Sequence, residues 1–117
     1  IHHLNSGDSV GYNLGYTAKS NISIATLPIG HADGIGRIYG KGTGEVLIGK
    51  QMTKIVGNVC MDMIMVDISR ISCNEGDEVI IFNDDSYSAE EFTTKAGTIS
   101  YELITSLSRR IKRKVIK

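Results

Sequence analysis

The stretch VLIGKQMTKIV, residues 46–56, places two apolar runs on either side of a Gly-Lys pair. The runs at 46–48 and 52–56 have the length and the β-branched residues of short strands. Gly49 and Lys50 between them can close a two-residue turn, because glycine reaches the positive φ that such turns require. The stretch therefore predicts an antiparallel β-hairpin near the middle of the chain.

Further strands are predicted on both sides of this hairpin. Their ranges are 10–16, 22–29, 63–68 and 78–82. The segment 10–16 alternates apolar with smaller or polar residues, a period that would place Tyr12 and Tyr16 on one face of a strand. The 117 residues hold 13 glycines and one proline, a composition typical of short strands joined by tight turns. We expect a mostly β domain.

Helices are predicted only near the C-terminal end. Ser88 and Glu91 have the spacing of a capping box, which predicts a helix that ends near Gly97. A second helix is predicted to open at Ser100, and residues 111–116 are expected to form a last strand. The predicted buried stripe of the second helix is Leu103, Leu107 and Ile111.

Charge and composition exclude several classes of protein. Thirteen Lys and Arg balance thirteen Asp and Glu, and 41% of the residues are hydrophobic, which argues against a disordered chain or a whole-domain nucleic-acid binder. Six of the thirteen bases lie in residues 109–117. This basic tail is expected to be a solvated edge or terminus, since no stacking aromatic residues accompany it.

Other sequence signals favour a cytoplasmic protein. The uncharged stretches are far shorter than the roughly 20 residues that span a bilayer, and the first residues of this sequence do not have the apolar h-region of a signal peptide. Cys60 and Cys73 are too few for a disulfide scaffold, and no metal site is expected. Cys60 is predicted to be a small buried hydrophobe, and His2 and His3 to be surface residues.

The glycine-rich segment 30–44 is predicted to be a long ordered loop of the kind that carries function. It contains three polar candidates, His31, Asp33 and Arg37. Two nucleotide-binding motifs are rejected nearby. The stretch GEVLIGK, residues 44–50, resembles a P-loop but continues with Gln51 instead of Ser or Thr, and the glycines at 34 and 36 lack the third glycine of a dinucleotide fingerprint.

Four stretches together carry a resemblance to a known family. They are GDSVGY at 7–12, LPIGHADG at 27–34, IVGNVCMD at 55–62 and GTISYE at 97–102. In this order and spacing they resemble the C-terminal domain of alanine racemase, over nearly the whole chain. The resemblance implies a mostly β fold, a Greek-key-like β-barrel with two short helices near the C-terminus.

The resemblance also implies a larger enzyme. Family members carry an N-terminal (β/α)8 barrel whose lysine holds pyridoxal phosphate, and residues 1–117 correspond to the C-terminal β domain alone. We therefore expect this chain to be one domain of a longer protein and to be inactive by itself. Members work as homodimers, so a second copy of the full-length protein is the expected partner, together with L- and D-alanine.

Racemisation needs two acid–base groups on opposite faces of the amino acid. The resemblance assigns one of these roles to Tyr12, which would act across the homodimer interface. It further implies that the backbone amide of Met61 binds the substrate carboxylate and that Tyr101 binds the cofactor phosphate. The residues expected around the entrance to the site are His31, Asp33, Arg37 and Asp62.

This sequence departs from the family pattern at several positions. His31 stands where most members have tyrosine, and Asn58 stands where many have arginine. Tyr101 is retained, which favours alanine over serine as the substrate.

The expected function is interconversion of L- and D-alanine for peptidoglycan synthesis, with no nucleic-acid or membrane partner. Two alternatives remain open from the residues: a small β-barrel binding module that uses the basic tail, and the C-terminal domain of another pyridoxal-phosphate enzyme such as an amino-acid decarboxylase. The Cys-Met-Asp stretch at 60–62 argues against the second.

Overall fold

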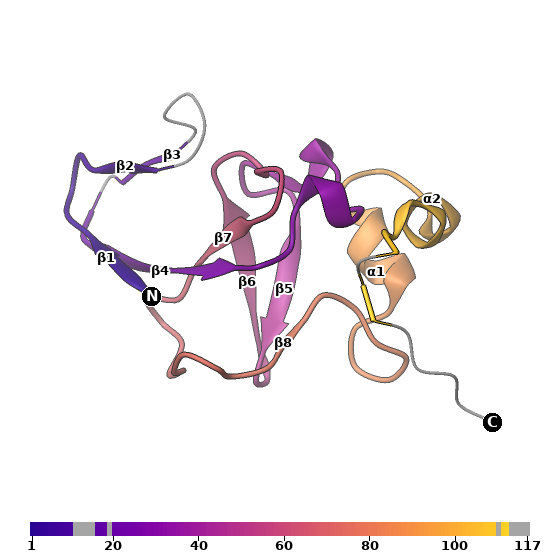
Figure 1. Cartoon of the computed structure of the whole chain (residues 1–117). Helices are drawn as coiled ribbons and strands as arrows, with labels where there is room; N and C mark the ends of the chain where they lie inside the picture. The colour runs from indigo at the N-terminus through magenta and orange to yellow at the C-terminus, as the bar shows by residue number, and fades with distance from the viewer. Residues whose placement is uncertain (11–15, 19, 110, 113–117) are drawn as a thin grey trace.

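The computed structural model describes residues 1–10, 16–18, 20–109 and 111–112. They form a six-stranded antiparallel sheet, a separate two-stranded ribbon and two short helices (Figure 1). The order of the large sheet is β1 (His2–Leu4), β4 (Ile22–Leu27), β7 (Ile64–Asp67), β6 (Gln51–Val56), β5 (Glu45–Ile48) and β8 (Val79–Ile80). The ribbon pairs β2 (Ser9–Val10) with β3 (Tyr16–Thr17).

The central hairpin is confirmed. β5 and β6 pair in register from Glu45 opposite Lys54 to Ile48 opposite Gln51, so that Gly49 and Lys50 form the turn. Gly49 has a φ of +61°, which is the conformation that favours glycine at this place. β7 and β4 extend the sheet on the far side of β6, as two of the predicted apolar runs require.

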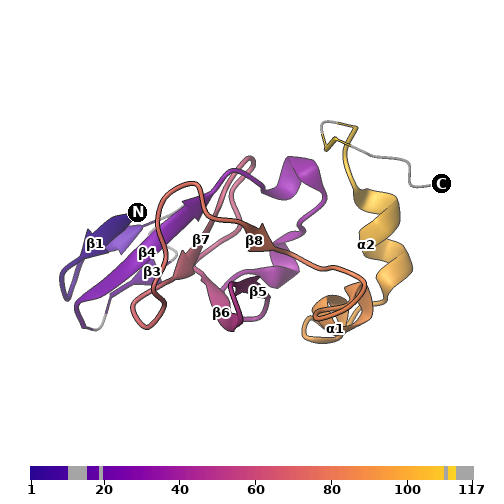
Figure 2. The ribbon, with the colours of Figure 1, turned by 90° about the horizontal axis from the view of Figure 1, so that it is seen from below.

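The prediction of a single strand over residues 10–16 is wrong. Val10 lies opposite Tyr16 in an antiparallel pair, so these two residues belong to different strands, and the positions between them lie outside the described residues. Two further backbone bonds join the base of this ribbon, from Gly7 N to Ala18 O (2.7 Å) and from Ala18 N to Asp8 O (2.8 Å). Figures 1 and 2 show the ribbon at the end of the molecule away from the helices.

The first helix, α1 (Ala89–Thr94), begins at the predicted capping box. The Glu91 amide donates to Ser88 Oγ at 3.0 Å, and the Ser88 amide donates to a Glu91 carboxylate oxygen at 3.3 Å. The helix ends near Gly97 as predicted: its regular turns stop at Thr94, Gly97 follows with a φ of +72°, and the Thr98 amide donates back to Thr93 O at 3.2 Å.

The second helix, α2 (Ser100–Ser106), begins at the predicted residue but is too short for its predicted stripe. Leu103 is buried within it, whereas Leu107 is extended and Ile111 lies outside the helix. The hydroxyls of Thr105 and Ser106 donate to carbonyls of the preceding turn, a competition that makes such residues poor at continuing a helix. The predicted strand at 111–116 lies outside the described residues, apart from its first two positions.

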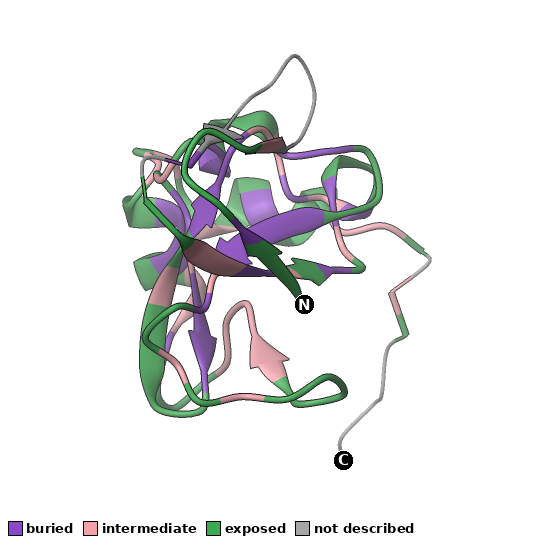
Figure 3. Ribbon diagram, turned by 90° about the vertical axis from the view of Figure 1, so that its left-hand side faces the viewer, coloured by how far each residue is buried: buried purple, intermediate pink, exposed green. Residues whose placement is uncertain are grey.

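The larger core cluster combines buried residues of the central strands with Phe92 of α1 and Leu103 of α2, and Figure 3 colours the buried residues purple. Phe92 of α1 is fully buried, and its ring packs against Tyr39 (4.5 Å between centroids), Tyr87 (6.1 Å) and Phe82 (6.5 Å). The Tyr87 hydroxyl donates to the carbonyl of Glu45 at 3.1 Å, which ties the helical end of the chain to β5. One aromatic cluster therefore joins α1 to the sheet.

The six-stranded sheet is open. Among the described residues its edge strands, β1 and β8, do not pair with each other. A mostly β fold with two short helices is confirmed, whereas closure into a barrel is not. Neither helix in the described part of the chain has the length and apolar character that crossing a membrane requires.

Replacing the central ring tests how the fold is held together. Phe92→Ala removes the residue at the centre of the aromatic cluster, and we expect it to lower the free energy of unfolding by about 3–5 kcal/mol. Met52→Ala, at an exposed position of β6, should change it by less than about 1 kcal/mol. Urea unfolding curves of the two variants measure the difference, and equal effects would show that Phe92 is not central to the core.

Stability should fall at high pH. Burial, with the charge of Glu45 next in size, raises the pKa of Tyr87, and burial with the charge of Glu102 raises that of Tyr39. An unfolded tyrosine ionises near pH 10.0. The stabilising effect is therefore complete below that pH and is lost progressively as the pH rises from there through the raised pKa of each phenol. When the free energy of unfolding is measured from pH 8 to 11, it should fall less steeply with pH in Tyr87→Phe than in the wild type. Equal slopes for the two proteins would contradict this account.

Candidate functional site

Most of the candidate residues lie on two loops at the ends of the central strands. Loop A, residues 28–44, joins β4 to β5 and contains two 3-10 turns, His31–Asp33 and Arg37–Tyr39. Loop B, residues 57–63, joins β6 to β7. Loop A lies between the sheet and the helices in two views (Figures 1 and 2). The prediction of an ordered loop here is confirmed.

Backbone hydrogen bonds hold the two loops together. The His31 amide donates to Cys60 O at 2.9 Å, and the Ala32 amide donates to Met61 O at 2.8 Å. Gly30 makes this approach possible, because a Cβ at its position would lie 2.5 Å from Cys60 O and 2.6 Å from Met63 N. Loop B also closes on itself, since the Cys60 amide donates to Met63 O at 3.0 Å.

This pairing fixes the direction of the Met61 amide. Cys60 O and Met61 N belong to one peptide unit, and in a trans peptide the C=O and N–H point in opposite directions. With the carbonyl held by loop A, the Met61 N–H faces away from that loop. Within the described residues this N–H has no hydrogen-bond partner, and the Met61 side chain is 56% exposed. The arrangement offers a fixed donor to an anionic oxygen such as that of a carboxylate.

Asp33 is the buried member of the candidate set, with 1% of its surface exposed. Its Oδ2 accepts the Gly30 amide at 3.0 Å, while its own amide donates to Gly30 O at 3.0 Å. The carboxylate thus lies inside the turn that pairs with loop B. Its place at an entrance remains a prediction.

The other described candidates are exposed. His31 and Arg37 lie on loop A and Asp62 lies on loop B. Tyr101, in the first turn of α2, is 76% exposed. The end of α2 meets loop A, because the Ser108 amide donates to Asp33 O at 3.2 Å. The two loops and α2 therefore form one continuous region, whereas Tyr12 lies outside the described residues.

The same region carries six exposed apolar side chains, of which only Met61 and Tyr101 were predicted as site residues. They are Ile38, Met61, Met63, Ile99, Tyr101 and Ile104. Apolar side chains gathered at an exposed surface often mark an interface. The sequence of α2 and its N-cap contains a sign of this exposure, because apolar residues at 99, 103 and 104 occupy more than one face of a short helix and cannot all be buried against the core.

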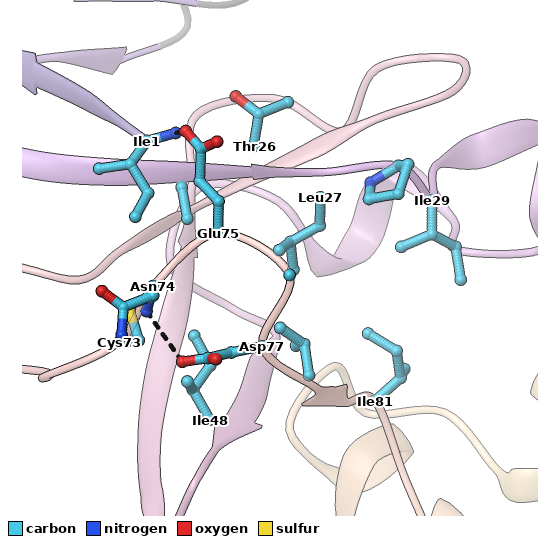
Figure 4. A pocket seen from close by; sticks show the side chains of 14 residues that line it. Ile1, Thr26, Leu27, Ile29, Ile48, Cys73, Asn74, Glu75, Asp77 and Ile81 are labelled. Carbon is cyan, nitrogen blue, oxygen red and sulfur yellow. Dashed lines mark hydrogen bonds and ion pairs between the residues drawn. The ribbon is translucent and has the colours of Figure 1, made fainter.

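A separate pocket of 610 Å³ lies between β4 and β8. Figure 4 shows its lining, with Leu27, Ile29, Ile48 and Ile81 along the walls and the Glu75–Asp77 turn at the rim. The N-terminal amine of the chain forms a salt bridge with Glu75 at 3.3 Å there. The lining contains none of the candidate residues, and the described part of the chain contains no cluster of three or more side chains fit to hold a metal ion.

Comparison with known proteins identifies relatives along the whole chain. The family model described as alanine racemase, C-terminal domain, matches residues 1–115. An alanine racemase of Desulforamulus reducens is 40% identical over 111 residues, which cover 94% of this chain and 30% of that protein.

Two solved structures show the same likeness. Alanine racemase of Clostridium difficile 630 in complex with cycloserine is 41% identical with a TM-score of 0.83, over 94% of this chain and 29% of that one. Alanine racemase of Bartonella henselae with covalently bound pyridoxal phosphate is 32% identical with a TM-score of 0.90, over 98% of this chain and 32% of that one.

The contact between the loops should not tolerate a side chain at residue 30. In Gly30→Ala the added methyl meets backbone atoms of loop B, so the loops must separate, and we expect a loss of about 1–3 kcal/mol. Amide hydrogen exchange at His31 and Ala32 should become faster in this variant. Gly36→Ala is a matched control, because Gly36 also has an extended backbone and the nearest atom to an added Cβ, in the Ile38 side chain, is 3.9 Å away. Unchanged exchange at His31 in Gly30→Ala would contradict the assigned pairing.

Proposed function

This chain belongs to the family of alanine racemase C-terminal domains, and we propose that it is the C-terminal domain of an enzyme that interconverts L- and D-alanine. The observation that carries the proposal is the family match over residues 1–115, together with relatives about 40% identical across nearly the whole chain. The chain spans about 30% of the length of those relatives. The activity therefore belongs to a longer protein, and the isolated domain is expected to be inactive.

In this proposal Met61 binds the substrate. Its backbone N–H is held away from loop A by the hydrogen bond between His31 N and Cys60 O, and it has no other partner among the described residues. A substrate carboxylate accepts from this N–H and is thereby oriented with its α-carbon in a fixed place. The donor is a backbone group, so its position depends on loop pairing and not on the Met61 side chain.

Tyr101 fits the proposed contact with the cofactor phosphate, because its side chain is strongly exposed at the first turn of α2. The other contacts with pyridoxal phosphate are assigned to the part of the enzyme outside this chain. When bound, this cofactor withdraws electrons from the amino acid and so makes the α-proton acidic. The role of this chain is then to place a proton acceptor and donor beside that carbon.

Tyr12 is the proposed acid–base group for one face of the amino acid. Its phenol oxygen would take the α-proton of one enantiomer and, in the reverse direction, return a proton to the same face of the α-carbon. A phenol needs a positive neighbour or strong hydrogen bonds to act as a base near neutral pH. We assign that help to the longer protein, which would also supply the group for the opposite face.

The exposed apolar residues around the two loops and α2 support a subunit interface there. Met61 and Tyr101 belong to that set, so the substrate and cofactor contacts would lie at the interface itself. We therefore include a homodimer in the proposal, with Tyr12 acting on the substrate held by the partner subunit. His31, Arg37 and Asp62, all exposed on the same loops, would line the entrance.

The remaining parts of the proposal concern the setting. The enzyme would work in the cytoplasm, provide D-alanine for peptidoglycan, and act without nucleic-acid or membrane partners. Closure of the sheet into a barrel is proposed for the intact protein, with the pocket between β4 and β8 as the place of closure. The basic tail that suggested a binding module lies mostly outside the described residues, and no observation favours that alternative.

Removing one phenol oxygen tests the catalytic assignment. In the full-length protein with its cofactor, Tyr12→Phe should lower L-to-D turnover by at least about 100-fold, because general acid–base groups contribute that much or more. Tyr87→Phe is the matched control: it loses a buried hydrogen bond to Glu45 O but should keep its turnover. Unchanged turnover in Tyr12→Phe would remove Tyr12 from the mechanism.

A further inference from the structure

Asp33 is almost completely buried, although carboxylates on surface loops are usually exposed. Only 1% of it is exposed, and transfer of a carboxylate out of water is costly unless hydrogen bonds compensate. Its Oδ2 accepts the Gly30 amide, and the reverse bond from the Asp33 amide to Gly30 O closes the same turn, both at 3.0 Å. Asp33 therefore fixes the conformation of residues 30–33.

That turn presents two amides to loop B. His31 N and Ala32 N lie between Gly30 and Asp33 in the sequence, and they hold the carbonyls of Cys60 and Met61 at 2.9 and 2.8 Å. Gly34 follows with a φ of +109° and lies against Ser106 O of α2, so the turn is also held from behind. A change in the Gly30–Asp33 bond thus reaches the peptide between Cys60 and Met61 through one further hydrogen bond.

We propose that Asp33 is a positioning residue that sets the direction of the Met61 N–H and thereby the affinity for the substrate carboxylate. The inference rests on the proposed function, which assigns that N–H to the substrate. Asp33 contacts neither the substrate nor the cofactor in this account. Its effect passes from its carboxylate to Gly30, then from the His31 amide to Cys60 O, and so to the amide of Met61.

The expected signature is a change in KM with little change in kcat. The carboxylate is held equally in the ground state and in the transition state, so weakening that contact is a loss of uniform binding. In the full-length protein with its cofactor, Asp33→Ala should raise KM for L-alanine about tenfold, the usual cost of a weakened bond to a charged group. Its kcat should stay within about threefold of wild type.

Two further variants separate positioning from simple destabilisation. Asp33→Asn keeps an oxygen that can accept the Gly30 amide, and it should restore KM to within about twofold of wild type. Ser88→Ala breaks the capping box of α1 and should lower the melting temperature without raising KM. If Asp33→Ala gives no folded enzyme, Asp33→Ser takes its place as the test of the positioning role, and we expect its KM to be raised at least threefold.

The outcomes have different consequences. If the wild-type enzyme racemises alanine and Asp33→Ala has an unchanged KM, the positioning role is overturned while the proposed function stands. If Asp33→Ala does not fold, an unchanged KM in Asp33→Ser has the same consequence. A fall in kcat of more than tenfold at unchanged KM also overturns it. If the wild-type protein with its cofactor shows no racemisation, the proposed function and this inference fail together.

Discussion

Two hydrogen bonds between backbone groups, from His31 and Ala32 to the carbonyls of Cys60 and Met61, are the contact on which the candidate site depends. They join two loops that lie at the ends of four neighbouring strands, and a third backbone bond, from Lys41 N to Gly57 O (2.7 Å), holds the same loops together nearer the sheet. The contact requires glycine at position 30, because backbone atoms of loop B occupy the place where any other residue would have its Cβ. Everything assigned to Met61 follows from this close approach, because it determines where one N–H points.

The rest of the fold supports this contact from two sides. Below the loops, the paired strands β4, β7, β6 and β5 hold the ends of both loops at fixed separations. On the other side, the aromatic cluster around Phe92 fixes α1, and α2 then packs against loop A at Gly34. Tyr39 belongs both to loop A and to that cluster, so the core and the loop are directly connected. Six of the exposed apolar residues, Ile38, Met61, Met63, Ile99, Tyr101 and Ile104, lie on this supported region.

The sequence predicted the regular parts of the fold well. The hairpin at Gly49, the apolar runs of β4 and β7 and the capping box at Ser88 are local patterns, and local patterns determine these elements. The strand predicted over 10–16 was wrong because Val10 and Tyr16 belong to two different strands of an antiparallel ribbon, which a period of two in the sequence does not distinguish from one continuous strand. The buried stripe predicted for α2 was wrong beyond Leu103 because the helix ends at Ser106, whose hydroxyl competes with backbone amides for a carbonyl of the preceding turn. The burial of Asp33 and the crowding at Gly30 arise between segments about 30 residues apart, which no local pattern can reveal.

The most direct test of this account is a crystal structure of the full-length protein with its cofactor and a small monocarboxylate such as propionate bound. The account predicts a carboxylate oxygen about 3 Å from Met61 N. The hydrogen bonds from His31 to Cys60 and from Ala32 to Met61 should be retained in that complex. A Met61 N–H that donates to a protein group, or a carboxylate held elsewhere with no contact to loop B, would contradict it.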